Sequence, residues 1–467
     1  MARSLDVPFA EKIAYSFGGV GKDFVYGVTF SFYTIFLNQV VGLDPLITGF
    51  FFFAARVFDG INDPLMGTLV DNTRTRWGKF RPWMAIGVLL NATILVLMFS
   101  GFDLSLLGKY YFYFTMYLLW GITYTLMDIP YWSLIPAISA TKDERNVISS
   151  LARLFSYGGT ALAGVLVPIL IGDDWSMENF LNIGFISAIL CVFTMLFTIT
   201  FTRERIVIPT EKISFRGIFK VFSQNDQLLA YIFTFGLFYL SSQVMSMAGV
   251  YYFQIVLNRV ELMSLFLLVG GAGGAGVSML AYPLLANKFG RRSIYLFAMA
   301  ITVLGFAIMS FFSYVFPEHP YLLVPVFIGG WLVFFALGIA AVGSTVMLAD
   351  VVDYGEWKNG HRTENIIFSA QCFLYKFAGA FTSVIIGITL RIGNIPTLDP
   401  EGIPTQAVTE FGENAIIFSL FTLPIFFVIP AALIYMKYYK LNGKYHEDII
   451  EDLHEQRKAR GQAPDEE

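Results

Sequence analysis

Residues 179–201 read NFLNIGFISAILCVFTMLFTITF, a run of 23 residues without an Asp, Glu, Lys or Arg. A helix of this length can cross the hydrocarbon core of a bilayer, which takes about 20 apolar residues. Runs of the same kind recur along the whole chain. The expected spans are 13–38, 46–69, 82–101, 109–137, 147–171, 179–201, 228–257, 262–286, 293–315, 321–349, 365–390 and 414–437. The sequence therefore predicts an all-α polytopic membrane protein with twelve transmembrane helices.

Composition supports a protein that is dissolved in lipid. Of the 467 residues, 56% are hydrophobic and 14% charged, with a mean hydropathy of +0.63, whereas soluble domains carry about 25% charged residues. The net charge of −4 and the lack of a basic domain argue against nucleic-acid binding.

Cys191 and Cys372 form no metal or disulfide pattern. No nucleophile–base set, zinc motif or phosphate loop predicts an enzyme, and no cofactor is expected. The first span is expected to belong to the mature fold, because no cleavage signature accompanies it.

The spans divide into two groups of six. A polar, basic break at 202–227 separates an N-terminal six-helix bundle, 1–201, from a C-terminal one, 228–440, and a charged tail follows at 441–467. The loop after the second span, with Arg74, Arg76 and Lys79, resembles the loop after the eighth, with Lys288 and Arg291. A positive loop at matching places fits the parallel repeat of major-facilitator transporters, although each loop alone could be an ordinary basic turn.

Basic residues predict the orientation. Of the 31 Lys and Arg residues, 24 fall on one side when both termini lie in the cytoplasm. Only Lys109, Arg259 and Arg391 fall on the other side, and four lie within spans. Positive loops stay inside, so we expect a cell-membrane protein with both termini in the cytoplasm.

The second span carries an unusual charge group. Arg56, Asp59 and Asp63 lie at i, i+3 and i+7, on one face of the helix. Two carboxylates one turn apart repel unless a cation or proton lies between them. Pro64 also leaves the carbonyl of Gly60 without its helical donor. This set of hard oxygen ligands suits Na⁺ or H⁺. The alternative is that Arg56 neutralises one Asp and the group is structural.

The fourth span carries a polar aromatic stripe. Tyr124, Asp128 and Trp132 lie at i, i+4 and i+8. A carboxylate between aromatic rings suits a sugar, whose hydroxyls bond to the carboxylate while its apolar face stacks on the indole. Thr125 could offer a further oxygen to a cation. The alternative is ordinary packing of the rings.

Charges in three other spans extend the expected site. Lys22 and Asp23 follow glycines that allow helices to approach closely, and Arg153 of the fifth span is a candidate partner for Asp23. A purely structural pair is the alternative. Lys376, in the eleventh span, could balance the carboxylates from the C-terminal half. Buried charges are costly and usually mark a substrate or ion path.

A charged loop is expected after the tenth span. Asp350, Asp353, Glu356 and Arg362 lie at its cytoplasmic edge. We expect a gating network in which the acids pair with basic residues of the N-terminal half when the inner gate is shut. A solvated loop is the other interpretation.

Five motifs together resemble the glycoside–pentoside–hexuronide:cation symporters, the family of the melibiose carrier. The resemblance covers essentially the whole chain. Its most specific pieces are Gly21-Lys22-Asp23-Phe24, Arg56-Val-Phe-Asp59-Gly-Ile-Asn62-Asp63-Pro64, Thr75-Arg76-Trp77-Gly78-Lys79-Phe80, Tyr124-Thr125-Leu-Met-Asp128-Ile-Pro-Tyr-Trp132 and Ala349-Asp350-Val-Val-Asp353-Tyr354-Gly355-Glu356.

The resemblance implies a role for each candidate residue. For the cation site it implies Asp59, Asp63 and Thr125. For the sugar site it implies Asp23, Asp128, Trp132 and Arg153, with Lys22 and Tyr124 nearby. Lys376 would organise both sites, and Asp353 and Glu356 would belong to a cytoplasmic ion-pair network. Two residues depart from the melibiose carrier, with Ala341 in place of a tryptophan and Cys372 in place of a threonine.

The expected function is symport of a glycoside, such as a galactoside, with Na⁺ or alternatively Li⁺ or H⁺, by alternating access. The expected partners are the sugar, the monovalent cation and the lipid bilayer, and the protein is expected to act as a monomer. One alternative is a lysolipid symporter of the same fold. Another is a membrane sensor that binds sugar without moving it.

Overall fold

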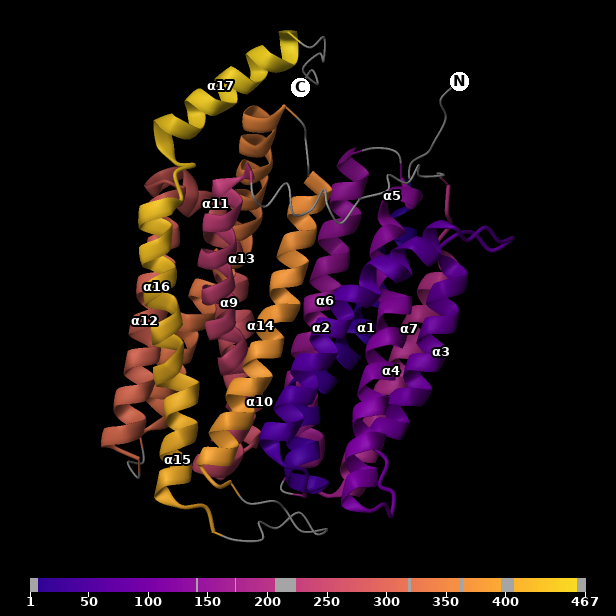
Figure 1. Cartoon of the computed structure of the whole chain (residues 1–467), viewed down its shortest axis with the longest axis vertical. Coiled ribbons are helices and arrows are strands. Elements are labelled where there is room, and N and C mark those ends of the chain that lie inside the picture. The colour runs from indigo at the N-terminus through magenta and orange to yellow at the C-terminus, as the bar shows by residue number, and fades with distance from the viewer. Residues whose placement is uncertain are drawn as a thin grey trace. The chain divides into compact units, whose positions relative to one another are not determined.

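The computed structural model describes residues 7–139, 142–172, 174–205, 224–317, 321–360, 364–395 and 407–459 (Figure 1). Throughout these ranges the regular elements are helices, and one isolated bridge joins Thr75 to Gly78. The first part of the chain forms α1 (Phe9–Ile35), the π-helix η1 (Phe36–Val40), α2 (Pro45–Asp71), α3 (Arg81–Met98), α4 (Leu106–Ser133), α5 (Ile135–Ile138), α6 (Lys142–Ile171) and α7 (Met177–Phe201).

The remainder repeats the pattern of long helices. It forms α9 (Asp226–Tyr251), η2 (Tyr252–Val256), α10 (Glu261–Gly270), η3 (Gly271–Gly276), α11 (Val277–Phe289), α12 (Arg291–Val315), α13 (Leu323–Asn359), α14 (Glu364–Ile392), α15 (Glu410–Ile417), η4 (Phe418–Thr422), α16 (Leu423–Tyr438) and α17 (Gly443–Ala459). Each expected span overlaps one long helix or one helix with a π turn, and the span 109–137 also takes in the short α5, which confirms the all-α membrane fold. One prediction is wrong: α13 continues past Ala349 to Asn359, so Asp350, Asp353 and Glu356 lie on a helix and not in a loop.

Nine helical segments of the described chain are long and apolar enough to cross a membrane. The helices α1, α2 and α4 are not among them. These three helices carry Lys22, Asp23, Asp59, Asp63 and Asp128, whose charges lower the mean hydropathy. The helices that fall short of this hydropathy therefore hold most, but not all, of the candidate sugar and cation residues.

The chain forms two compact units. Unit 1 contains 1–210, 249–267 and 383–416, and unit 2 contains 211–248, 268–382 and 417–467. In unit 1, α1 packs against α6 and α7, and α4 packs against α2 and α3. Glycine lets α1 approach α7 closely, because a Cβ on Gly21 would lie 2.7 Å from the Cα of Cys191. This close approach is the one expected of the small residues in α1.

A second close contact in unit 1 joins the start of α2 to α14. A Cβ on Gly49 would lie 2.7 Å from the carbonyl oxygen of Ser383, and one on Gly387 would lie 2.5 Å from that of Pro45. An ion pair between Asp44 and Arg391 borders the contact. Backbone therefore packs directly on backbone where the two helices meet.

Unit 2 is built around α12 and α13. A Cβ on Gly305 or on Gly329 would lie 2.6 Å from the carbonyl oxygen of the other glycine, so these two helices also touch through their backbones. The last helix, α17, runs away from the end of α16, in yellow in Figure 1, and contacts α13. Its Ile449 and Leu453 are buried, which fixes the predicted surface helix of the tail on unit 2.

Four π-helical turns interrupt the described membrane helices: η1 and η2 in unit 1, and η3 and η4 in unit 2. In a π turn the backbone hydrogen bond reaches five residues back instead of four. The turn η3 has the sequence Gly-Ala-Gly-Gly-Ala-Gly and packs on α13, where a Cβ on Gly274 would lie 3.0 Å from the carbonyl oxygen of Trp331. Its glycines thus permit a close helix contact at a turn of irregular geometry.

Candidate functional site

The candidate sugar site is organised by a buried lysine. The Nζ atom of Lys22 on α1 lies 2.7 Å from Oδ1 of Asp23 and 2.7 Å from Oδ1 of Asp128 on α4. The Lys22 side chain is only 2% exposed, whereas that of Asp128 is 30% exposed. One ammonium group therefore joins two carboxylates from different helices, and Asp128 keeps an accessible acceptor.

Aromatic rings surround this ammonium group. The Nζ atom lies 5.3–5.5 Å from the ring centroids of Tyr124, Tyr131 and Trp132, within reach of cation–π attraction. The hydroxyl of Tyr124 donates to Asp23 at 2.9 Å. The indole Nε1 of Trp132 donates to Asp128 at 3.0 Å. These hydrogen bonds fix the orientation of both carboxylates.

The structure gives Arg153 a different neighbour from the expected one. Asp23 is held by Lys22 and Tyr124. The guanidinium carbon of Arg153 on α6 lies 5.5 Å from the centroid of the Trp132 ring. Arg153 itself is exposed. Arg153 therefore adjoins the aromatic wall and keeps its donors available for another group.

The candidate cation residues face α4 from α2. The hydroxyl of Thr125 donates to Asp63 at 3.2 Å. One turn earlier on both helices, a Cβ on Gly121 would lie 2.9 Å from Oδ1 of Asp59, so only glycine leaves room for this carboxylate. The structure thus brings together the carboxylates of Asp59 and Asp63, with Thr125, along one side of α4.

Arg56 already neutralises one of these carboxylates. Its guanidinium group donates to Oδ2 of Asp59 at 3.2 Å and lies 5.7 Å and 6.0 Å from the ring centroids of Tyr26 and Tyr117. The neutralising role considered from the sequence is therefore present. It leaves Oδ1 of Asp59 for other partners.

Sequence reasoning missed two groups near this site. Asn62 is 7% exposed, and its amide nitrogen has no hydrogen-bond partner among the described residues. Tyr26 lies between the candidate cation residues and the candidate sugar residues, because its ring contacts Arg56 of the first group and Tyr124 of the second. A polar residue between Asp59 and Asp63 was a visible signal for Asn62. Nothing in the local sequence distinguished Tyr26 from the many other aromatic residues.

Lys376 lies on α14 in unit 2 and is half-buried. Ala341, also in unit 2, lies on α13. The side chain of Cys372 lies outside the described part of the structure. The role of Lys376 in the two sites remains a prediction.

The acidic residues at the end of α13 have partners within unit 2. Arg291 of α12 donates to both oxygens of Asp350, at 3.2 and 3.1 Å, and Nε2 of His446 lies 3.3 Å from Asp350. Arg457 of α17 donates to both oxygens of Glu356, at 3.0 and 2.7 Å, and contacts Asp353 at 3.4 Å. Tail residues therefore hold these acids. The fourth predicted gating residue, Arg362, lies outside the described residues.

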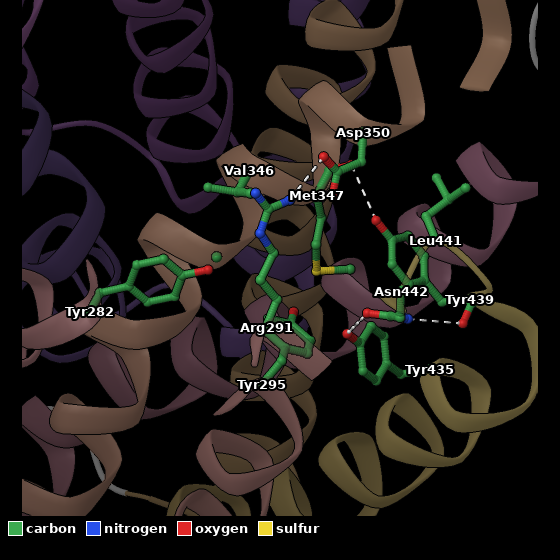
Figure 2. Close-up of a pocket in the computed structure, with 11 residues that line it drawn as sticks. Tyr282, Arg291, Tyr295, Val346, Met347, Asp350, Tyr435, Tyr439, Leu441 and Asn442 are labelled. Atoms are coloured by element: carbon green, nitrogen blue, oxygen red, sulfur yellow. Dashed lines mark hydrogen bonds and ion pairs between the residues drawn. The ribbon is translucent and has the colours of Figure 1, made fainter. Parts of the chain in front are cut away.

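A small cavity lies beside the Arg291–Asp350 pair, next to the start of α17 (Figure 2). Figure 2 shows Arg291 reaching toward Asp350, while Asn442 lies between Tyr435 and Tyr439. Tyrosines and apolar side chains form most of the remaining lining. This cavity is separate from the candidate sugar and cation residues, all of which apart from Lys376 belong to unit 1.

A second polar network closes one end of unit 1. Glu144 accepts hydrogen bonds from the Ser139 hydroxyl at 2.6 Å, from Lys12 at 3.0 Å and from the backbone N–H of Val7 at 2.9 Å. The Ser139 hydrogen bond has the largest effect on the pKa of Glu144. Burial opposes it, but with the help of Lys12 and Val7 the pKa is lowered to about 2. Glu144 therefore stays ionised and ties the N-terminal segment to α6.

Comparison with known proteins places the chain among transporters. Residues 14–443 match the family model described as MFS/sugar transport protein. The inner membrane symporter YicJ of Escherichia coli is 30% identical over 453 residues, with 95% of this chain and 94% of the relative covered. An isoprimeverose transporter of Lactiplantibacillus pentosus is 27% identical, with 97% and 93% covered. A lactose permease of Lactobacillus delbrueckii subsp. bulgaricus is 26% identical, with 95% and 72% covered.

A solved structure shares the fold. The crystal structure of the nucleoside transporter NupG superposes with a TM-score of 0.64 at 14% identity, with 92% of this chain and 99% of NupG covered. At so low an identity the likeness concerns the architecture alone. It agrees with the all-α, multi-pass arrangement read from the helices.

Proposed function

Because the chain belongs to the MFS/sugar transport protein family, we propose that it carries a glycoside across the cell membrane together with a monovalent cation. The names of the relatives, a lactose permease, an isoprimeverose transporter and a symporter, support a sugar as cargo and a cation as co-substrate. A galactoside is the sugar we favour and Na⁺ the cation, with Li⁺ and H⁺ as the alternative ions.

The observation that carries the sugar assignment is the Lys22–Asp23–Asp128 arrangement within an aromatic wall. Sugar hydroxyls can donate hydrogen bonds to carboxylates. Carboxylates that the protein holds in place can accept them in one defined orientation of the sugar. Asp128 is more accessible than Asp23 and would accept hydrogen bonds from two neighbouring hydroxyls of the sugar. The Trp132 ring would stack on the apolar face of the pyranose, and Arg153 beside it would donate to a further hydroxyl.

The cation assignment rests on Asp59, Asp63 and Thr125. Carboxylate and hydroxyl oxygens are hard ligands and suit a small hard cation. Arg56 supplies one positive charge to the two carboxylates. One further monovalent cation makes the group of Arg56, Asp59 and Asp63 neutral, which favours an ion of charge +1 over a divalent ion.

The proposed mechanism is alternating access. Two six-helix bundles, 1–201 and 228–440, would rock about the site, with both termini in the cytoplasm and Lys376 contributing from the second bundle. The acids of α13, held by the tail here, would exchange partners during the cycle. The alternation requires the site to be charged when empty and neutral when loaded, because a neutral site can move through the low-dielectric interior more readily.

The test is uptake of a panel of labelled glycosides into right-side-out vesicles with and without a Na⁺ gradient. Uptake that rises with Na⁺ is the expected result and would begin to identify the sugar. Uptake that follows only a proton gradient would move the coupling ion to H⁺. No uptake of any glycoside under either gradient would overturn the proposal and favour a lysolipid cargo or a non-transporting sensor.

A further inference from the structure

A basic turn joins α2 to α3, at the end of unit 1 where α1 begins. The location follows from the segment after α7, whose Glu204 contacts this turn and whose Arg205 pairs with Glu11 in the first turn of α1. The side chains of Arg74, Arg76 and Trp77 are exposed there, the indole by 66%. An exposed indole next to two exposed arginines needs a partner outside the protein to cover its apolar surface.

The turn is rigid. The hydroxyl of Thr75 donates to the carbonyl oxygen of Gly78 at 2.8 Å and accepts from the N–H of Trp77 at 3.1 Å. Gly78 has a φ of +103°, which only glycine adopts without strain. The carboxylate of Glu204 accepts from three consecutive backbone N–H groups, of Lys79, Phe80 and Arg81, at 2.7, 3.0 and 3.2 Å. The exposed side chains therefore project from a fixed backbone.

The flanking helices place this turn at the height of lipid headgroups. Leu65 and Leu69 on α2, and Ile86 and Leu89 on α3, are exposed apolar side chains of the kind that face hydrocarbon. Leu69 lies two residues before the end of α2 at Asp71, and Arg74 follows that end by three residues, so the turn comes directly after the lipid-facing part of the helix. The headgroup layer on each side of a bilayer is about 5–8 Å thick.

Arg74 and Arg76 have no carboxylate partner among the residues that the structure describes. None of the ion pairs in the described part of the chain involves Arg74 or Arg76, and the nearby Glu204 carboxylate is engaged by backbone N–H groups. Lys79, at the other end of the turn, adds a third positive charge. Guanidinium groups bind phosphate oxygens in pairs, and Trp favours the interface between hydrocarbon and water.

We propose that the turn from Arg74 to Lys79 is a binding surface for the phosphate headgroup of an anionic lipid. Arg74 and Arg76 bind the phosphate oxygens, and the Trp77 indole lies among the glycerol and upper acyl groups. Charge complementarity selects the occupant, because a zwitterionic headgroup brings its own cation to the same place. The inference is independent of which sugar or ion is carried.

The test compares phosphatidylglycerol with phosphatidylcholine. The full-length protein is reconstituted in phosphatidylcholine vesicles with spin-labelled lipid of either headgroup, and electron spin resonance measures the fraction immobilised on the protein. We expect preferential association of phosphatidylglycerol that weakens in high salt. Since a basic residue at an anionic surface strengthens association on the order of fivefold, Arg74→Gln/Arg76→Gln should remove most of the preference.

Lys437→Gln/Lys444→Gln is the matched control, because it removes the same charge from exposed positions near the end of α16. It should keep the preference. An unchanged preference in the arginine variant, or an equal loss in the lysine control, would overturn the proposal. Displacement of the labelled lipid by inorganic phosphate, but not by chloride at the same ionic strength, would also overturn it, since the turn would then bind a free anion.

A second measurement does not depend on the arginine variants. Brominated lipids quench the fluorescence of a neighbouring indole, and the difference between the wild type and Trp77→Phe isolates Trp77 from the other six tryptophans. Brominated phosphatidylglycerol should quench Trp77 more than brominated phosphatidylcholine does. Equal quenching by the two lipids would contradict a headgroup-selective surface.

Discussion

Lys22 is a single buried positive charge on which two half-buried carboxylates depend. Replacing it by Gln leaves Asp23 and Asp128 close together without their shared cation. Breaking a buried ion pair from one side costs about 3–5 kcal/mol. Lys22→Gln should therefore lower the free energy of unfolding by a similar amount and abolish glycoside binding.

Thermal unfolding and equilibrium sugar binding in detergent would measure both effects. Lys288→Gln, which removes an exposed lysine from α11, is the control and should leave both unchanged. Wild-type melting and binding in Lys22→Gln would show that the two carboxylates do not need this ammonium group.

The hydrogen bonds and ion pair of Glu144 should make the stability of the fold depend on pH in the acidic range. Its pKa falls from an ordinary value of 4.5 to about 2 in the folded protein, chiefly through the Ser139 hydrogen bond. A carboxyl group with a depressed folded pKa stabilises the fold fully above the unfolded pKa. That contribution is lost as the pH falls from about 4.5 toward 2.

Melting temperatures measured across this acidic window should therefore fall more steeply in the wild type than in Glu144→Gln. At neutral pH the Gln variant should be the less stable protein. Parallel curves for the two proteins would mean that Glu144 titrates normally.

At the scale of elements, the contact of α2 with α14 depends on having no side chain at Gly49. A larger residue there would meet the carbonyl of Ser383, and overpacking costs about 1–3 kcal/mol. Gly49→Leu should lower the melting temperature and loosen the Asp44–Arg391 ion pair. Gly67→Leu on the same helix has open space at its Cβ and should be neutral or slightly stabilising, because leucine favours helix. Equal effects of the two substitutions would argue against a close contact.

The tail helix α17 is expected to detach when Arg457 is lost. Its guanidinium group holds Glu356, whose side chain is 6% exposed, and also contacts Asp353. A buried charge left without its partner costs about 1–3 kcal/mol or more. Arg457→Gln should therefore speed hydrogen exchange throughout Gly443–Ala459, whereas Lys444→Gln, an exposed residue of the same helix, should not. Unchanged exchange would mean that other contacts, such as those of His446, Ile449 and Leu453, are enough to hold the helix.

At the scale of the whole molecule, cation and sugar binding must be coupled in both directions. If Na⁺ raises the affinity for sugar, sugar raises the affinity for Na⁺ by the same factor. Asp59→Cys removes a carboxylate of the proposed cation site and should abolish stimulation of sugar binding by Na⁺. Asp103→Cys, in an exposed loop, is the control and should retain it. Stimulation that persists in Asp59→Cys would exclude that carboxylate from the cation site.

The sequence predicted the fold well because hydropathy is a local property. Each expected span overlaps a long helix, and the end of α13 was misplaced because charged residues were taken to end a helix that continues to Asn359. The sequence singled out the candidate residues that the structure brings close together on α1, α2 and α4, but not which of them pair; their roles stay predictions. The partner of Asp23 depends on how α1, α4 and α6 pack, so the neighbouring Lys22 could not be preferred over Arg153 by inspection. Arg457, which holds Glu356, and His446, one of the two partners of Asp350, lie about a hundred residues away in the tail, where no local pattern points to them.

The four π turns have a consequence for how such a chain can change over generations. Each holds one residue more than an α turn of the same height, so a codon can be gained or lost there while the helix on either side keeps its faces. In η3 the spare position lies in a run of glycine and alanine, where no bulky side chain has to be relocated. Small changes in gene length can thus be absorbed inside the membrane itself, and not only in the loops outside it.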